Sequence, residues 1–494
     1  MTTDSPRSAR SPRSRAKLGR AAFAALGALA ALVPSLAMWG FTVDDALIPI
    51  RYAHNLASGA GYRFDAAGPS TDGVTPLPWA WLLAPMSGGD ALVTLARAKA
   101  LGVVAWTCAG AALGACVHRM ASGRVRVVTA ALALGVMALA FPIGAWAASG
   151  METGVVTALA TSAAVALALA RPRAAAALAG VCGAFRPEMV LWALVVGAGA
   201  AASAAKPKRW LLVALAVGPF AACALVRLVV WGRPAPLAVL AKPSDFSHGA
   251  TYALAACVVV STPILATAPI AIATTGARVA KVLGLAFVAH VLAVIAAGGD
   301  WMPFARLLVP VAPSLVIVFV STSVVVRPAW IAARLVVAFA FGLFLTARAA
   351  PSGRSVYGDR SALIACARPA LAGARVVAGL DVGWLGASTD ARVVDLAGLT
   401  DPSIALLPGG HTSKRVDVSM LLDREVDVVV LYSETRVVEA RILDSDLFIA
   451  RFELFETLPI RGRRASYSLY RRRAVTWPSP ASPRSEPPTE SASP

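Results

Sequence analysis

Over about the first 350 residues, long runs of apolar side chains alternate with short polar segments. A helix that crosses a bilayer needs about 20 mostly apolar residues, and the runs have this length or come close to it. We therefore predict about eleven transmembrane helices, at residues 20–39, 98–117, 125–146, 153–170, 174–185, 189–204, 210–231, 251–273, 282–297, 304–326 and 335–350. The runs at 174–185 and 189–204 are unusually short. The pattern is typical of a polytopic α-helical membrane protein.

The pattern changes after residue 351. Short segments rich in Val and Tyr indicate strands; they read ARVVAGLDVG, ARVVDLAGL, EVDVVVLYS and SYSLYRR, and VDVSMLLDRE indicates a helix before the third of them. The two ends are rich in Ser, Pro and charged residues, a composition typical of disorder. We predict a disordered basic cytoplasmic tail at 1–16, a transmembrane domain at 17–351, a small α/β extracytoplasmic domain at 352–474 and a disordered tail at 475–494.

Composition agrees with a membrane protein, because 57% of the 494 residues are hydrophobic and only 15% are charged. The net charge of +19 is typical of many nucleic-acid-binding proteins. Here, however, most cations lie in short clusters between apolar runs, and no basic stripe alternates with aromatic residues. We therefore expect no nucleic-acid partner. The six cysteines show no spacing typical of a metal site or a disulfide framework.

The cation clusters also predict the orientation in the membrane. Lys and Arg are enriched in cytoplasmic loops, and with eleven alternating helices and a cytoplasmic N-terminus the clusters fall on one side. They are the N-terminal tail, Arg119, Arg124 and Arg126, Arg171 and Arg173, Lys206, Lys208 and Arg209, Arg278 and Lys281, and Arg327 and Arg334. This orientation places the C-terminal domain outside the cell. An alternative is that the first apolar run is a signal peptide, since a basic segment precedes it.

Five polar or charged segments collect on the predicted outer face. They are DDALIPIRYAHN (44–55), SGMET (149–153), FRPE (185–188), RPAPLAVLAKP (233–243) and GGDWMPFARLLVP (298–310). Ordinary connecting loops in such an apolar chain would be shorter and less charged at the bilayer edge. Ionisable groups near the hydrocarbon are costly and often functional. The pattern favours a composite active site over a set of solvated loops.

These segments resemble the GT-C glycosyltransferases, integral membrane enzymes that use polyprenyl-linked sugars. The more similar branch contains the mycobacterial terminal β-(1→2)-arabinofuranosyltransferase. The resemblance rests on the acidic loop, the turn TPLPW, SGMET, RPE, GGDWM with a following Arg, and VVDLAGLTDP at 393–402, and it covers residues 38 to 402. It implies a GT-C-like catalytic domain in the bacterial inner membrane, with a role in cell-envelope glycan biosynthesis.

The resemblance implies transfer of a sugar, arabinofuranose in that branch, from a polyprenyl-phosphate donor to a hydroxyl of a glycan or glycolipid, with inversion. It gives Asp44 the role of general base, and Asp45 that of an orienting group or metal ligand. Partial desolvation would suit such a base, because it raises the carboxyl pKa toward neutrality. The structural alternative is that the two carboxylates cap a helix N-terminus. ALIPIRYAHNLASG indicates a short amphipathic helix there.

Other residues in these segments have two readings. The phosphate that leaves needs charge-assisted donors, and the candidates are Arg51, Arg186, Lys242 and Arg306; each could instead extend to lipid headgroups. Further substrate-binding candidates are His54, Glu152, Glu188, Asp300 and Trp301, although a structural ion pair is the better reading of Glu188. Asp45 and Asp300 could bind Mg²⁺ or Mn²⁺, but Arg and Lys alone can hold a monophosphate.

Aromatic residues are ambiguous as well. Trp79, Trp146 and Trp301 either stack on a sugar ring or belong to the interfacial aromatic belt. The outer domain offers Asp381, Trp384 and Asp395 for binding a glycan, and nothing further. Competing functions are transfer of another sugar, such as mannose or aminoarabinose, to lipid or protein, a transporter of lipid-linked sugars, and a non-catalytic glycan-binding scaffold. A transporter is disfavoured because the chain shows no internal repeat.

Overall fold

The computed structural model describes residues 12–205, 209–242, 244–265, 273, 276–323, 325–461 and 464–473. The first helix, α1, begins at Pro12, inside the segment predicted to be a disordered tail. The rest of that tail (1–11), the C-terminal tail at 475–494, Lys206 and Lys208 lie outside the described residues.

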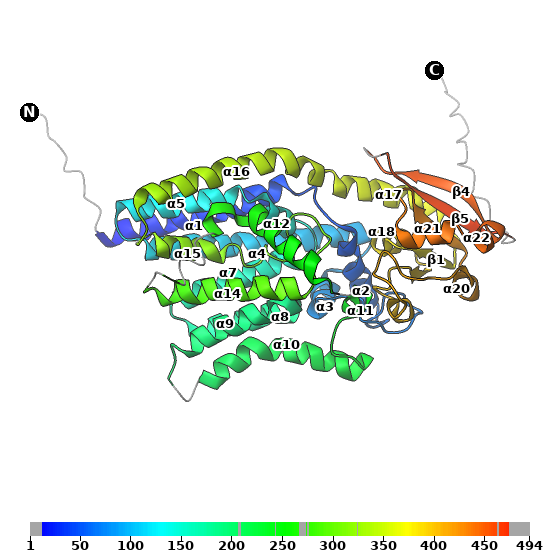
Figure 1. Cartoon of the computed structure of the whole chain (residues 1–494), viewed down its shortest axis with the longest axis horizontal. Coiled ribbons are helices and arrows are strands. Elements are labelled where there is room, and N and C mark those ends of the chain that lie inside the picture. The colour runs from blue at the N-terminus through cyan, green and yellow to red at the C-terminus, as the bar shows by residue number, and fades with distance from the viewer. Residues whose placement is uncertain are drawn as a thin grey trace, which may run out of the picture.

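Long apolar helices lie side by side and a small sheet domain is attached at one end of them (Figure 1). The long helices and their neighbours are α1 (Pro12–Ala37), α4 (Ala91–Met120), α5 (Arg124–Ala138), α6 (Phe141–Ala147), α7 (Thr153–Ala168), α8 (Pro172–Phe185), α9 (Val190–Ala201), α10 (Arg209–Trp231), α12 (Phe246–Leu265), α14 (Arg278–Ala296), α15 (Ser314–Thr322) and α16 (Pro328–Arg354). The shorter helices α2 (Leu47–Ala57), α3 (Leu77–Leu83) and α11 (Leu237–Ala241) lie near the sheet domain (Figure 1). Three 3₁₀ turns complete the described elements of this part: η1 (Asp44–Ala46), η2 (Ala84–Met86) and η3 (Pro187–Met189).

Each of the eleven predicted apolar runs contains a described helix. Five helices in the described part of the chain are long and apolar enough to cross a bilayer: Lys17–Ala37, Ala91–Met120, Arg209–Trp231, Arg278–Ala296 and Pro328–Ala370. The pair α5 and α6, bent by 59°, makes a sixth if it forms one span. The chain is therefore a helical membrane protein by length and composition, and the predicted number of eleven spans is not confirmed.

Proline explains two differences from the predicted helices. The run at 125–146 bends near Pro142, whose ring would clash with the carbonyl of Ala138 and which lacks an N–H to continue the helix. The run at 304–326 becomes helical only at Ser314. Turns occupy its first part because Pro310 and Pro313 interrupt the helical hydrogen bonds. Helix α15 is consequently about 14 Å long, less than half of a bilayer core.

Small residues bring α1 and α4 into backbone contact. A Cβ atom added at Gly27 would lie 2.1 Å from the carbonyl oxygen of Gly110, and one at Gly114 would lie 1.9 Å from that of Phe23. Gly110 and Gly114 form a GxxxG motif, which lets helices in a bilayer pack closely where no hydrophobic effect drives them together. The first helix is thereby packed against the bundle along its length.

The C-terminal domain contains one mixed sheet with the strand order β2-β1-β3-β5-β4. Strands β1 (Val376–Gly379), β2 (Arg392–Asp395) and β3 (Val428–Tyr432) are parallel, whereas β5 (Ser466–Arg472) runs antiparallel to β3 and to β4 (Phe452–Pro459). The four predicted strands and the helix at Val418–Asp423 are confirmed. Strand β4 was not predicted, because its charged residues and a bulge between Leu454 and Glu456 interrupt the alternating pattern.

Helices connect the strands and attach the sheet to the bundle. They are α17 (Val356–Ala370), α18 (Val382–Ser388), α19 (Pro402–Ala405), α20 (Val418–Asp423), α21 (Val437–Leu443) and α22 (Asp446–Arg451). Helix α17 follows α16 after a single residue, so the two form one long rod that leads from the bundle into the domain (Figure 1). Helix α18 packs against η1 and α2, and α19 packs against α11.

Candidate functional site

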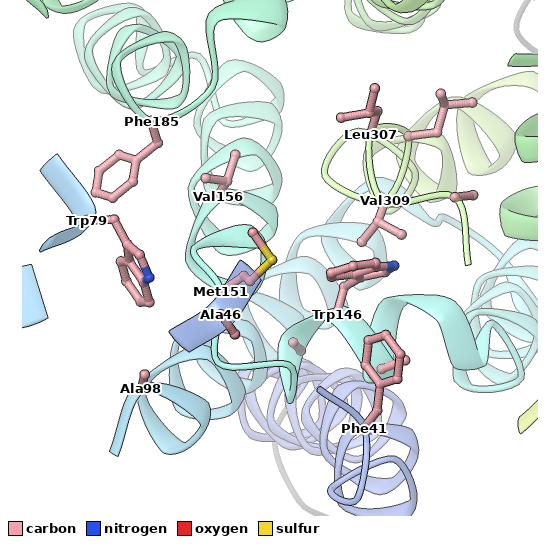
Figure 2. Close-up of a cluster of buried hydrophobic side chains, with 14 of the residues drawn as sticks. Phe41, Ala46, Trp79, Ala98, Trp146, Met151, Val156, Phe185, Leu307 and Val309 are labelled. Carbon is pink, nitrogen blue, oxygen red and sulfur yellow. The ribbon is translucent and has the colours of Figure 1, made fainter. Parts of the chain in front are cut away.

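A cavity of about 360 Å³ lies at the end of the bundle that carries the sheet domain. All five polar segments that the sequence places on one face contribute to its wall. Its charged and aromatic lining residues are Asp45, Glu152, Arg186, Glu188, Lys242, Asp300, Trp301 and Arg306. Apolar residues complete the wall: Met151, Phe185 and Leu307 line it and belong to the buried cluster shown in Figure 2. Leu399 of the C-terminal domain closes part of it.

The two adjacent aspartates of η1 have different surroundings. Asp45 lines the cavity, and no hydrogen bond or ion pair holds its carboxylate within the described residues. It lies close enough to act electrostatically on Arg306 and on His411. Asp45 is therefore the carboxylate of the pair that is free to meet a ligand.

Asp44 points to the C-terminal domain instead. Its two carboxylate oxygens accept hydrogen bonds from the backbone N–H groups of Gly383 and Trp384, at 2.8 and 2.9 Å, at the start of α18. Arg360 lies 3.9 Å away. Burial raises the pKa of Asp44 to about 6, against the opposing effect of Arg360. The structural alternative, a capping aspartate, describes this contact, although the capped helix lies more than 300 residues further along the chain. Of the two aspartates, Asp45 lines the cavity and Asp44 does not.

Arg306 and Asp300 form an ion pair in the wall. Arg306 Nε donates to Asp300 Oδ2 at 2.7 Å, and Asp300 Oδ1 accepts from the backbone N–H of Trp301. The backbone around the pair is unusual, because Phe304 and Ala305 have φ values of 60° and 54°. Such strain in non-glycine residues is often stored at functional sites.

Neighbouring side chains hold this strained segment in place. Trp146 donates its indole N–H to the Phe304 carbonyl at 3.0 Å, and the Tyr252 hydroxyl accepts from the N–H of Leu307 at 3.1 Å. The guanidinium of Arg306 lies over the Trp146 ring, and Nη1 reaches the Met151 sulfur at 3.7 Å. Tyr252 was missed by sequence analysis, since nothing marks one Tyr within an apolar run as a positioning residue.

Arg186 is neutralised by two carboxylates. It forms an ion pair with Glu152 at 2.7 Å and donates to Glu188 at 2.8 Å, and its Nη2 also donates to the Thr153 hydroxyl at 3.0 Å. The predicted structural ion pair of Glu188 is present, with Arg186 as its partner. Two buried atoms of these three side chains, Arg186 Nε and Glu152 Oε2, have no hydrogen-bond partner among the residues that the structure describes. Since buried polar atoms are nearly always paired, they call for water or a ligand.

At the edge of the cavity, Lys242 follows α11. No ion pair or hydrogen bond engages its ammonium group within the described residues, in contrast to Arg186 and Arg306. Trp301 lies at the same edge and is 68% exposed. Its ring stacks on His248, with centroids 4.0 Å apart, and lies 6.4 Å from the ring of His411 in the C-terminal domain.

Two predicted site residues lie elsewhere. Arg51 donates to the carbonyl oxygens of Phe64, Gly386, Thr389 and Ala391 and to Asp65, so its guanidinium is saturated. It joins α2 to the sheet domain and does not line the cavity that contains Asp45. His54 is exposed and lines a separate pocket of about 510 Å³ on the other side of α2. A saturated arginine is a structural residue. Sequence analysis could not predict its contacts with Gly386, Thr389 and Ala391, because these lie more than 300 residues away.

Several aromatic and acidic predictions are corrected. Trp79 and Trp146 are fully buried, so they neither mark the interfacial belt nor face a sugar. In the C-terminal domain, Trp384 is buried, and Asp381 forms a bidentate ion pair with Arg436. Asp395 is fully buried and accepts hydrogen bonds from three backbone N–H groups and one hydroxyl in the following turn. These three residues therefore support the domain itself.

The carboxylates of the cavity are the groups that could bind a metal ion. Within the described ranges, no three His, Cys, Asp or Glu side chains gather as metal ligands would. Both oxygens of Asp300 already accept hydrogen bonds. Asp45 retains free oxygens, which suits a base as well as a ligand.

Comparison with known proteins finds a family only for the C-terminal domain. Residues 361–475 match a family described as "Domain of unknown function (DUF8728)". The match begins within α17 and extends past β5, so it includes the sheet and excludes the bundle. No curated protein matches the chain.

Proposed function

We propose that this protein is a membrane glycosyltransferase of the GT-C type. In this proposal it moves a sugar from a polyprenyl-phosphate donor to a hydroxyl group of an extracytoplasmic glycan or glycolipid. Arabinofuranose is the sugar that the resemblance of the acidic loop and GGDWM suggests. The bundle would lie in the bacterial inner membrane with the N-terminus in the cytoplasm and the sheet domain outside.

One observation carries the proposal. Five polar segments, separated by long apolar helices, meet in one cavity. It is lined by two cations, Arg306 and Lys242, and by the carboxylate of Asp45, which pairs with no described residue. A lipid-linked phosphosugar needs cations for its phosphate, a base for the acceptor hydroxyl and an apolar route for its lipid. The cavity offers the first two, and its wall is continuous with the apolar core of the helices.

The reaction that fits these groups is an inverting displacement. Asp45 would take the proton of the acceptor hydroxyl while that oxygen forms a bond to the anomeric carbon of the sugar. The bond between this carbon and the phosphate oxygen breaks, and its electron pair remains on the phosphomonoester that leaves. A positioned carboxylate of this kind contributes about 10²–10⁴-fold to a rate.

The leaving phosphate would be bound chiefly by Arg306 and Lys242. Arg186 already faces two carboxylates, so its positive charge is balanced within the wall. Arg306 faces one bound carboxylate, and Lys242 faces none at ion-pair distance in the part of the chain that is described. Charge-assisted donors in a desolvated site stabilise a developing phosphate charge strongly.

The experiment is transfer of radiolabelled sugar from a panel of polyprenyl-phosphate donors by the purified full chain, with and without Mg²⁺, Mn²⁺ and EDTA. The panel includes arabinofuranosyl, mannosyl and aminoarabinosyl donors, and the acceptors include glycans and glycolipids. We expect turnover with one donor class and its loss in Asp45→Asn. His54→Ala is the control, because His54 is exposed and lies outside the cavity.

The alternatives give different results. Turnover that survives in Asp45→Asn would remove the base from this residue. Uptake of a lipid-linked sugar into proteoliposomes without transfer would favour the transporter, for which the acids and arginines of the cavity would also be suited. Glycan binding without turnover or uptake would favour the scaffold.

A further inference from the structure

The edge of the cavity carries an aromatic surface that transfer chemistry at Asp45 does not use. Trp301 is 68% exposed although it follows the buried Asp300 directly. His248 covers one face of the indole in a nearly parallel stack with an interplanar angle of 12°. The exposed area therefore belongs to the other face and to the ring edges.

Backbone contacts fix the orientation of this surface. The imidazole of His248 lies 3.4 Å from the Asp300 carbonyl oxygen, and Asp245 caps the start of α12 by accepting from the N–H groups of Ser247 and His248. Gly299, with φ of 73°, lets the chain pass directly against Tyr252 before Trp301. An aromatic ring held in this way loses little entropy when a ligand stacks on it.

The C-terminal domain adds a second ring. His411 lies in the loop between α19 and α20, and its ring is 6.4 Å from that of Trp301 at an interplanar angle of 52°. The loop is held by Lys414, which donates to the carbonyl oxygens of Ala405 and Leu407 at 2.7 and 2.9 Å. The two rings come from different domains, so the surface exists only where the domain meets the bundle.

Charges around this surface are mixed. The positive charges of Lys242 and Arg436 lower the pKa of His411, and the negative charges of Asp45 and Asp300 raise it. Burial, followed by Lys242, lowers the pKa of His411 to about 4, so its imidazole is neutral at physiological pH. A neutral imidazole has one donor and one acceptor nitrogen, which suits a hydroxyl group better than a phosphate or a carboxylate.

We propose that Trp301, His248 and His411 form a binding subsite for a neutral sugar ring of the acceptor, with Trp301 as the stacking surface and His411 as a hydrogen-bonding partner for its hydroxyls. The electron-rich face of an indole attracts the polarised C–H groups on the apolar face of a sugar. A ring seated there lies beside the cavity that Asp45 lines. That the bound glycan is the acceptor rests on the proposed function. That a neutral glycan binds there does not.

The test is direct binding, measured by saturation-transfer NMR on the detergent-solubilised full chain. The probes are neutral arabino- and manno-oligosaccharides, an acidic oligosaccharide, and decaprenyl phosphate for the cavity. We expect a neutral oligosaccharide to bind about tenfold more weakly to Trp301→Ala and to His411→Ala, which corresponds to one stacking or hydrogen-bond interaction. Decaprenyl phosphate should bind both variants as it binds the wild type.

Two controls separate a subsite from general damage. Trp330→Ala removes a tryptophan that is similarly exposed, at 63%, in the first turn of α16, whose opposite end continues into α17 and the sheet domain; it should leave glycan binding unchanged. His411→Gln keeps hydrogen-bonding groups and should weaken binding less than His411→Ala.

Each outcome decides the inference. Equal glycan affinity in wild type, Trp301→Ala and His411→Ala would overturn it and assign Trp301 to the membrane interface. Absence of neutral-glycan binding to the wild type, while decaprenyl phosphate binds, would also overturn it and leave the proposed function standing. Glycan binding that depends on both rings, together with no turnover on any donor, would support the subsite and contradict the enzyme.

Discussion

Asp44 and Asp45 are adjacent in sequence, yet they belong to two regions that use charge differently. At the seam between bundle and sheet domain, Asp44 accepts two backbone N–H groups and Arg51 donates to four carbonyls. In the cavity, Asp45 and Lys242 have no such partner in the described structure. Saturated polar groups hold two parts of a protein together, whereas unsatisfied groups in a concave site are available to a ligand.

The comparison teaches that local sequence identifies polar clusters but not their use. Both regions are polar, lie at the same end of the bundle and include residues of the same acidic loop. Only the partners differ. The distinction is therefore tested by comparing substitutions in the two regions: a cavity substitution should lower activity, and a seam substitution should lower stability.

The largest expected effect follows from the proposed role of Asp45 as the general base. In Asp45→Asn we expect the transfer rate to fall by about 10²–10⁴-fold, because an amide cannot accept the acceptor's proton. The donor KM should change little, and the apparent melting temperature of the solubilised protein should stay within a few degrees. Steady-state transfer kinetics and differential scanning fluorimetry measure both. If Asp44→Asn lowered the transfer rate as much without lowering the melting temperature, the general base would be Asp44 instead.

Arg306→Gln should produce the next largest effect. It removes the cation that faces both Asp45 and the cavity, and we expect a loss of about 10²–10³-fold in kcat/KM, typical of a lost donor to a developing oxyanion. Arg306→Lys should recover part of it, since a charge remains without the planar fork that holds Asp300. Transfer kinetics with the donor that the wild type uses provide the measurement. A cavity that works equally well with Gln would not bind a phosphate at this residue.

Much of the fold follows from the period and length of apolar runs. Each of the eleven runs contains a helix among the described residues, and the Val-rich segments form strands, because burial requires the same local patterns wherever they occur. The start of α15 and the edge strand β4 did not follow, because prolines and charged edge residues override that pattern locally. A helix must also be long enough to cross the bilayer, and five of the described helices meet that condition.

The site followed from the sequence in part. Placing five polar segments on one face required only alternation of helices across a membrane, and the five meet in one cavity. The roles of Arg51 and Trp146 depended on contacts with residues far away in the chain, and His54 lines a separate pocket. His411 was missed for the same reason: its nearness to Trp301 arises only when the domain docks.

A smaller effect is expected at the seam. Asp44→Ala leaves the N–H groups of Gly383 and Trp384 without acceptors and Arg360 without its neighbouring carboxylate. We expect the free energy of unfolding of the domain to fall by about 1–3 kcal/mol at mildly acidic pH. The fall would appear as a lower melting temperature or as easier proteolysis between α17 and the sheet. Asp45→Ala is the matched control and should not destabilise the domain. Equal destabilisation by both would erase the difference between the two regions.

The smallest effect is the pH dependence of that loss. Burial raises the pKa of Asp44 from about 4 in the unfolded chain to about 6, so the folded state holds this proton more tightly than the unfolded state does. The stabilisation from this proton is complete below about pH 4 and is lost as the pH rises through about 6. The difference in melting temperature between wild type and Asp44→Ala should therefore shrink between pH 4 and pH 7. Asp395, whose pKa burial also raises to about 6, remains in both proteins, so the difference isolates Asp44. A difference that grows with pH would mean that the ionised carboxylate, and not its protonated form, is the one the seam favours.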